Sequence, residues 1–219
     1  AALKVESTGS IQAGTIRITG PDTTLTSDGS GSDADLLASS RAAILRAGVD
    51  PFNNAHNIPQ TVGGTVVAGG ILADQPPGSI MVTEINTSDD NGGNGGPIIL
   101  EASGNITARD LLAFAETFVD RDAGNGGNIS IVSSGGNILT SGKVSSFSQS
   151  LGNDGDAGIS GRIFIEAAGT ITTGELNTFS FLNSPTSGDN ADNAGNIFVS
   201  SNSGDIDITE RKRALSSST

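Results

Sequence analysis

The chain has 219 residues, with no Cys, Trp or Tyr and only one Met and one His. The lack of Cys excludes disulfide scaffolds, thiolate metal sites and Cys nucleophiles. A single His excludes a His-rich metal site and a two-His mechanism within one chain. Only 11 Lys and Arg stand against 24 Asp and Glu, and the net charge of −13 argues against nucleic acid and anionic membranes as partners. No apolar run approaches the roughly 20 residues that cross a bilayer, so we expect no membrane insertion.

Glycine is abundant, with 31 residues, about twice its average share. Many of the glycines mark an internal repeat. Each of four copies opens with Gly and a short aliphatic strand, at Gly96, Gly127, Gly161 and Gly195, with spacings of 31, 34 and 34 residues. A second Gly and a second strand follow eight or nine residues later, and then a third strand with Phe. A loop of Gly, Asn and Asp closes each copy.

Three short strands per copy, each entered through a turn residue, predict one coil of a β-helix. One coil cannot bury its apolar residues alone, but stacked coils can. Alternation places the pairs Ile98/Leu100, Ile129/Ile131, Ile163/Ile165 and Ile197/Val199 on one inward face. We therefore predict an all-β parallel β-helix, a single solenoid over residues 1–219 with regular coils of about 31–34 residues over 96–219.

The first half of the chain is less regular. Residues 3–7 and 9–19 repeat the strand pattern, and residues 65–68 and 79–85 return to it. Between them, residues 20–64 are interpreted as a loop and helix insertion. Residues 33–48 predict a helix, because acids stand at the start, Arg stands near the end and Gly48 follows.

Strands of the Gly-Asn-Ile type, Gly-Asp/Asn loops and an Ala/Leu-rich insert together resemble filamentous-haemagglutinin-like large exoproteins. These are passengers of two-partner secretion and include cyanobacterial surface-layer-type repeat proteins. The resemblance implies a right-handed winding, an exported location and adhesion. It carries no catalytic signature. The last residues stop inside a repeat, which predicts that the chain is a segment of a longer passenger.

Acidic loops before the strand-opening glycines are the first candidate site. In stacked coils, the oxygens of Asp89, Asp120, Asp122, Asp154 and Asp156 would form columns. Repulsion between like charges there would be relieved by a hard cation, so calcium is one interpretation. The alternative is that Asp, Asn and Gly serve only the geometry of solvated turns. We expect no required cofactor, with structural calcium as the alternative.

Three apolar residues take the outward position of the first strand, namely Ile99, Phe164 and Phe198. They predict either a contact face or a surface covered by an insertion. Asp205 and Asp207 flank Ile206 in the arrangement of a glycosidase carboxylate pair, but ordinary outward alternation explains them equally well. A lone loop His56 and the basic run at 211–213 predict no catalytic role and no nucleic-acid binding.

The sequence thus favours a non-enzymatic, secreted or cell-surface protein that acts in adhesion or in building an extracellular layer. Its expected partners are copies of itself stacked end-to-end into a filament, other cell-surface components, or glycans. A carbohydrate-active β-helix enzyme and a calcium- or glycan-binding module are the alternatives.

Overall fold

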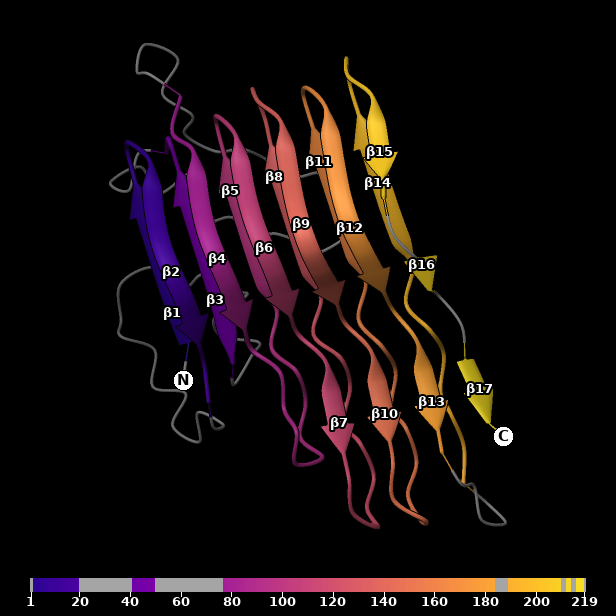
Figure 1. Ribbon diagram of the computed structural model, residues 1–219. Coiled ribbons are helices and arrows are strands. Elements are labelled where there is room, and N and C mark those ends of the chain that lie inside the picture. Colours follow the sequence, from indigo (N-terminus) through magenta and orange to yellow (C-terminus); the bar gives the residue numbers. More distant parts are fainter. Residues whose placement is uncertain are drawn as a thin grey trace.

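The computed structural model describes residues 2–19, 41–49, 77–183 and 189–209, and the backbone of 212–213 and 216–218. Every described element is a β-strand, and all described strand pairs are parallel. Equivalent strands of successive coils lie side by side, which is the arrangement of a β-solenoid (Figure 1). The parallel β-helical prediction is confirmed at this level. Its right-handed winding stays a prediction.

Two sheets run the length of the described solenoid, and a shorter third sheet accompanies its later coils. Sheet A contains β1 (Ala2–Ser7), β3 (Ala42–Ala47), β5 (Ile98–Ala102), β8 (Ile129–Ser133), β11 (Ile163–Ala167) and β14 (Ile197–Ser201). Sheet B contains β2 (Ile11–Arg17), β4 (Ile80–Asn86), β6 (Ile106–Leu112), β9 (Ile138–Ser145), β12 (Ile171–Asn177) and β15 (Ile206–Ile208), with β16 (Lys212–Arg213) beside β12. Sheet D contains β7 (Ala115–Thr117), β10 (Ser148–Ser150), β13 (Ser180–Leu182) and β17 (Ser216–Ser218).

The core lies between sheets A and B. Leu45, Leu100, Ile131 and Ile165 of sheet A are fully buried in one cluster with residues of sheet B such as Ile85. Because sheet A is in register from coil to coil, its inward residues stack in continuous aliphatic columns. This confirms the inward face expected from the alternation. At the last coil, Ile197 and Val199 are only partly buried.

The predicted helix over residues 33–48 is not supported. Ala42–Ala47 forms strand β3 between β1 and β5, and residues 33–40 lie outside the described residues. Helix propensity favours this composition by only tenths of a kcal/mol per residue. Pairing with two neighbouring strands and burial of Ala43, Leu45 and Ala47 against the core outweigh that preference. The rest of the predicted insertion, and the strand expected at 65–68, also lie outside the described residues.

Strands β7, β10 and β13 each begin just after a Phe, and these three Phe residues form a stacked aromatic column. Phe114, Phe147 and Phe179 lie ring on ring, with centroids 4.5 and 4.6 Å apart and nearly parallel planes. The rings are partly buried, while the inward residues of β7 and β10 are small and include Ser148, a fully buried residue.

No helix in the described part of the chain has the length and apolarity that crossing a bilayer would require.

Candidate functional site

The chain leaving sheet B meets the chain returning to sheet A between the core and sheet D, and we call this narrow region the waist. Backbone hydrogen bonds mark it, from the N–H of Gly96 to Thr87, of Gly127 to Ala113 and of Gly161 to Ser146. The hydroxyls of Thr87 and Thr178 donate hydrogen bonds to the carbonyl oxygens of Gly96 and Gly195, at 2.6 and 2.8 Å. Ser146 donates in the same way to the carbonyl of Gly127. Small hydroxyl residues therefore hold the two chain segments together across the waist.

The four strand-opening glycines of the repeat all lie at this waist. A methyl group on any of them would overlap a backbone carbonyl of the preceding coil. The glycines are Gly96, Gly127, Gly161 and Gly195, which meet the carbonyl oxygens of Arg41, Gly96, Gly127 and Gly161 respectively. The repeat therefore conserves Gly from coil to coil because successive coils approach each other too closely here for any side chain.

Side-chain oxygens join successive coils at the turns. At the entry to sheet B, the oxygens of Ser10, Ser79, Asn105 and Asn137 accept the backbone N–H of Ser79, Asn105, Asn137 and Thr170 respectively, at 2.7–3.1 Å. We call these four residues the entry column. Each bond satisfies a turn N–H that the strand ladders leave unpaired. The sequence revealed these residues as turn formers but not as links between coils.

The acidic residues proposed as calcium ligands take part in similar bonds. Asp120 accepts the N–H of Asn153 at 2.7 Å, and Asp122 accepts the N–H of Asp156 at 2.9 Å. Asp156 in turn accepts the N–H of Asn190 at 2.6 Å. Backbone N–H groups thus contribute a positive partner for these three carboxylates.

Asp89 occupies a different environment from the other acids. It is buried, forms an ion pair with Arg41 and accepts the N–H of Asn91 at 2.7 Å and of Gly93 at 3.1 Å. Asp154 is exposed. The described residues include no group of three or more His, Cys, Asp or Glu placed to hold a metal ion. Calcium binding by these loops stays a prediction.

The three residues of the expected contact face share one outward column of sheet A. Ile99 pairs with Ser130, Ser130 with Phe164, and Phe164 with Phe198. The rings of Phe164 and Phe198 stack with centroids 5.0 Å apart. Ile99 is 1% exposed, Phe164 8% and Phe198 51%, although none of the three belongs to the core cluster. The surface that this column offers is therefore at Phe198.

The remaining candidates are dispersed. Asp205 and Asp207 are both exposed on the last coil. His56 and Arg211 lie outside the described residues. Lys212 and Arg213 make up strand β16, whose backbone pairs with Leu176 and Asn177 of β12.

Two half-buried carboxyl groups have shifted pKa values. Burial and the charge of Asp90 raise the pKa of Glu116. Burial alone would raise the pKa of Asp110, but the backbone N–H of Lys143, the guanidinium of Arg109 and the charge of Lys143 together lower it. Neither residue lies among the predicted sites, and the second shift reflects another bond between coils, from the N–H of Lys143 to Asp110 at 2.9 Å.

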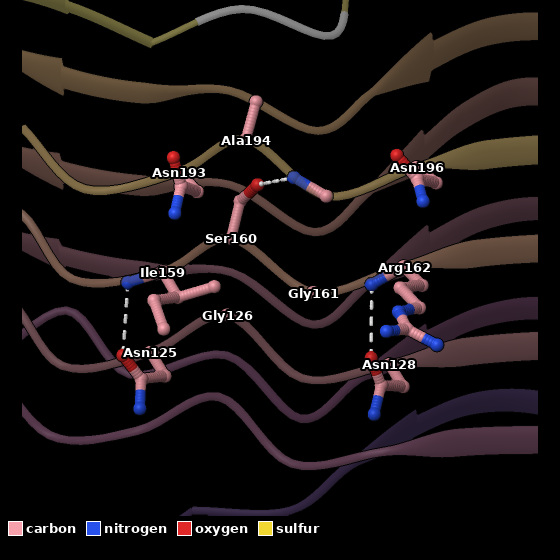
Figure 2. Close-up of a pocket in the computed structure, with 11 residues that line it drawn as sticks. Asn125, Gly126, Asn128, Ile159, Ser160, Gly161, Arg162, Asn193, Ala194 and Asn196 are labelled. Carbon is pink, nitrogen blue, oxygen red and sulfur yellow. Dashed lines mark hydrogen bonds between the residues drawn. The ribbon is translucent and has the colours of Figure 1, made fainter. Parts of the chain in front are cut away.

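The outer side of the waist forms a groove of about 350 Å³ that spans three coils (Figure 2). One rim carries Asn125, Ile159 and Asn193, and the other carries Asn128, Arg162 and Asn196. Gly126, Ser160, Gly161, Ala194 and Gly195 form the floor. Sequence analysis did not identify this groove, because its rims are ordinary turn residues until the waist brings them into two facing columns.

Hydrogen bonds hold the groove in shape. Asn125 accepts the N–H of Ile159 and Asn128 accepts the N–H of Arg162, both at 2.9 Å, as Figure 2 shows. Ser160 accepts the N–H of Gly195 at 2.6 Å across the floor. The rims are therefore part of the same system of bonds between coils.

Comparison with known proteins found no matching family model, curated protein or solved structure. The assignment of function therefore depends on the geometry described above and on the resemblance of the repeat.

Proposed function

We propose that this chain is a non-enzymatic rod, secreted or held at the cell surface, that acts in adhesion or in an extracellular layer. The observation that carries the proposal is the in-register stacking of the coils along the described chain. A solenoid built in this way is stiff, because each coil is joined to the next by strand pairing, aliphatic stacking and side-chain hydrogen bonds. The resemblance of the repeat to filamentous-haemagglutinin-like exoproteins supports export and adhesion.

Location is the part of the proposal to test first. Antibodies raised against the purified chain should label intact cells of the source organism, or detect the protein in the medium. Protease added to intact cells should remove the surface label. Labelling that requires permeabilised cells, with none in the medium, would contradict the proposal.

A second element of the proposal is association of the rod with further copies of itself. In the described sheets, β1 and β2 at one end and β14 and β15 at the other have a neighbouring strand on one side only (Figure 1). Phe198 and Ile206 are exposed at the β14 and β15 end. Exposed strand edges are templates for pairing with another chain.

The two ends are complementary in register. Ile206 pairs with Ile171 and Ile11 with Ile80, so β15 and β2 hold the same position in their coils. Asp205 is the residue of the last coil that is equivalent to the residues of the entry column. A second copy stacked in register would bring its Ser10 N–H to Asp205. Such a head-to-tail contact repeats without closing, and its product is a filament.

A further inference from the structure

The groove along the waist has rims whose chemistry matches that of a hydroxyl group. Four of its six rim residues are Asn, and an amide both donates and accepts hydrogen bonds, as a sugar hydroxyl does. Arg162 adds donors on one rim, and it forms no ion pair within the described part of the chain. Ile159, which is 48% exposed, offers an apolar contact on the opposite rim.

Two of the four rim amides are fixed before binding. The carbonyl oxygens of Asn125 and Asn128 are held by the N–H groups of Ile159 and Arg162, which leaves each NH2 group as a donor. Among the described residues, neither NH2 group makes a hydrogen bond. A ligand that binds here does not have to order these side chains, which lowers the free energy lost on binding.

The groove repeats along the rod axis. Strands of successive coils lie about 4.8 Å apart, so each rim presents one side chain at that interval. An extended polysaccharide advances by nearly the same length with each sugar. Both rims carry Asn in the first and third of the three coils, with Ile159 and Arg162 between them, so hydroxyls of alternate sugars would meet the amides. An extended peptide fits less well, because the turn N–H groups that it would need are already bonded within the solenoid.

We propose that the groove binds a neutral, linear polysaccharide that lies along the rod axis. A neutral chain is favoured because the net charge of −13 repels polyanions. The inference deepens the proposed adhesive function and rests on it for access to a polysaccharide at the cell surface. Binding is measured on the purified chain, so failure of the groove and failure of the surface location give different results.

The chain contains no Trp or Tyr, so one introduced Trp is a unique fluorescent reporter. Ile159→Trp places it on the rim of the groove. Leu139→Trp is the matched control, because Leu139 is 42% exposed on β9 and does not line the groove. Linear β-1,4-linked hexasaccharides of glucose, mannose and N-acetylglucosamine are titrated into both variants, with a galacturonate hexasaccharide as the acidic comparison. Titration calorimetry on the unchanged chain gives the affinity without the reporter.

We expect at least one neutral hexasaccharide to shift the emission of Ile159→Trp and leave that of Leu139→Trp unchanged. Adding Arg162→Ala and Asn196→Ala to Ile159→Trp should weaken this binding about tenfold, because hydrogen bonds to the sugar are lost. The acidic hexasaccharide should bind more weakly than the neutral one. Circular dichroism checks that every variant retains its fold.

Three results would overturn the inference. The first is that none of the neutral hexasaccharides binds, either to the reporter or in calorimetry on the unchanged chain. The second is an equal response of the groove and control reporters, which would place binding elsewhere. The third is tighter binding of the acidic hexasaccharide, which would assign the site to anionic ligands.

Discussion

Gly161 lies where the chain returning to sheet A passes closest to the coil before it. A methyl group on Gly161 would overlap the Gly127 carbonyl and the Ser146 hydroxyl. We expect Gly161→Ala to lower the free energy of unfolding by about 1–3 kcal/mol, the usual effect of forcing extra volume into a packed site. Urea unfolding followed by circular dichroism measures the change.

Gly14 supplies the control for this substitution. An added methyl group at Gly14 meets no atom within 4 Å. Because Ala restricts the unfolded chain more than Gly does, Gly14→Ala should be neutral or stabilise by up to about 1 kcal/mol. Equal effects of the two substitutions would contradict the close approach at the waist.

A second prediction at the residue scale concerns Glu116. Burial and the charge of Asp90 raise the pKa of its carboxyl group in the folded chain. A raised pKa means that the fold favours the protonated form, so this contribution to stability is present at low pH and is lost as pH rises through the folded-state pKa. Glu116→Gln should therefore raise the melting temperature slightly at pH 7 and leave it unchanged near pH 3.

Asp110 shows the opposite dependence and serves as the comparison. Its pKa is lowered in the folded chain, so its contribution to stability is present at neutral pH and is lost as pH falls through the folded-state pKa. Asp110→Asn should lower the melting temperature at pH 7 and have little effect near pH 2. Melting curves across this range that are the same for both variants would refute the assignment.

At the scale of the element, the side-chain hydrogen bonds at the turns determine how one coil is joined to the next. Asn137 accepts the N–H of Thr170 at 2.7 Å, and its own N–H donates to Asn105 at 2.8 Å. Asn137→Ala removes the first acceptor and should destabilise the chain by about 1 kcal/mol. Hydrogen exchange of the Thr170 amide should become faster than that of other turn amides. General destabilisation would speed the exchange of all of them, so this difference reports the lost bond.

Two further variants make this measurement decisive. Asn137→Asp retains an acceptor oxygen and should keep most of the protection at Thr170. Asn202 is exposed and takes part in strand pairing only through its backbone, so Asn202→Ala should change neither stability nor exchange. Loss of protection in all three variants would show that the entry column is not the cause.

The strands that could be predicted are those whose side chains alternate clearly and follow a Gly turn. Ile129 and Ile131, for example, indicated both the strand and the inward face. The strand at Ala42–Ala47 could not be predicted, because Ala, Leu and Arg favour a helix locally. Only pairing with β1 and β5, which are distant in sequence, makes it a strand. Long-range pairing of this kind leaves little trace in a local pattern.

The same limit applies to the candidate sites. The sequence located the Asp and Asn turns, but the partner of each oxygen is a backbone N–H on the next coil, about 33 residues away. Residue types alone do not distinguish such a bond from a metal contact. The groove was missed for a related reason, since only the waist brings Asn125 and Asn128 to facing rims.

At the scale of the whole molecule, charge opposes the end-to-end stacking that the strand edges favour. Every copy carries a net charge of −13. Salt screens this repulsion, with a Debye length of about 10 Å at 0.1 M and about 3 Å at 1 M.

We therefore expect the sedimentation coefficient to rise with protein concentration, and more steeply at 0.5 M than at 0.02 M sodium chloride. Ile206→Lys places a charge on the exposed strand β15 at the end of the rod and should prevent this association. Leu139→Lys is matched in exposure and charge but lies on β9 within the rod, so it should associate as the unchanged chain does. A monomer at every salt and protein concentration would contradict stacking. Loss of association in both Lys variants would point to a non-specific contact instead of the ends.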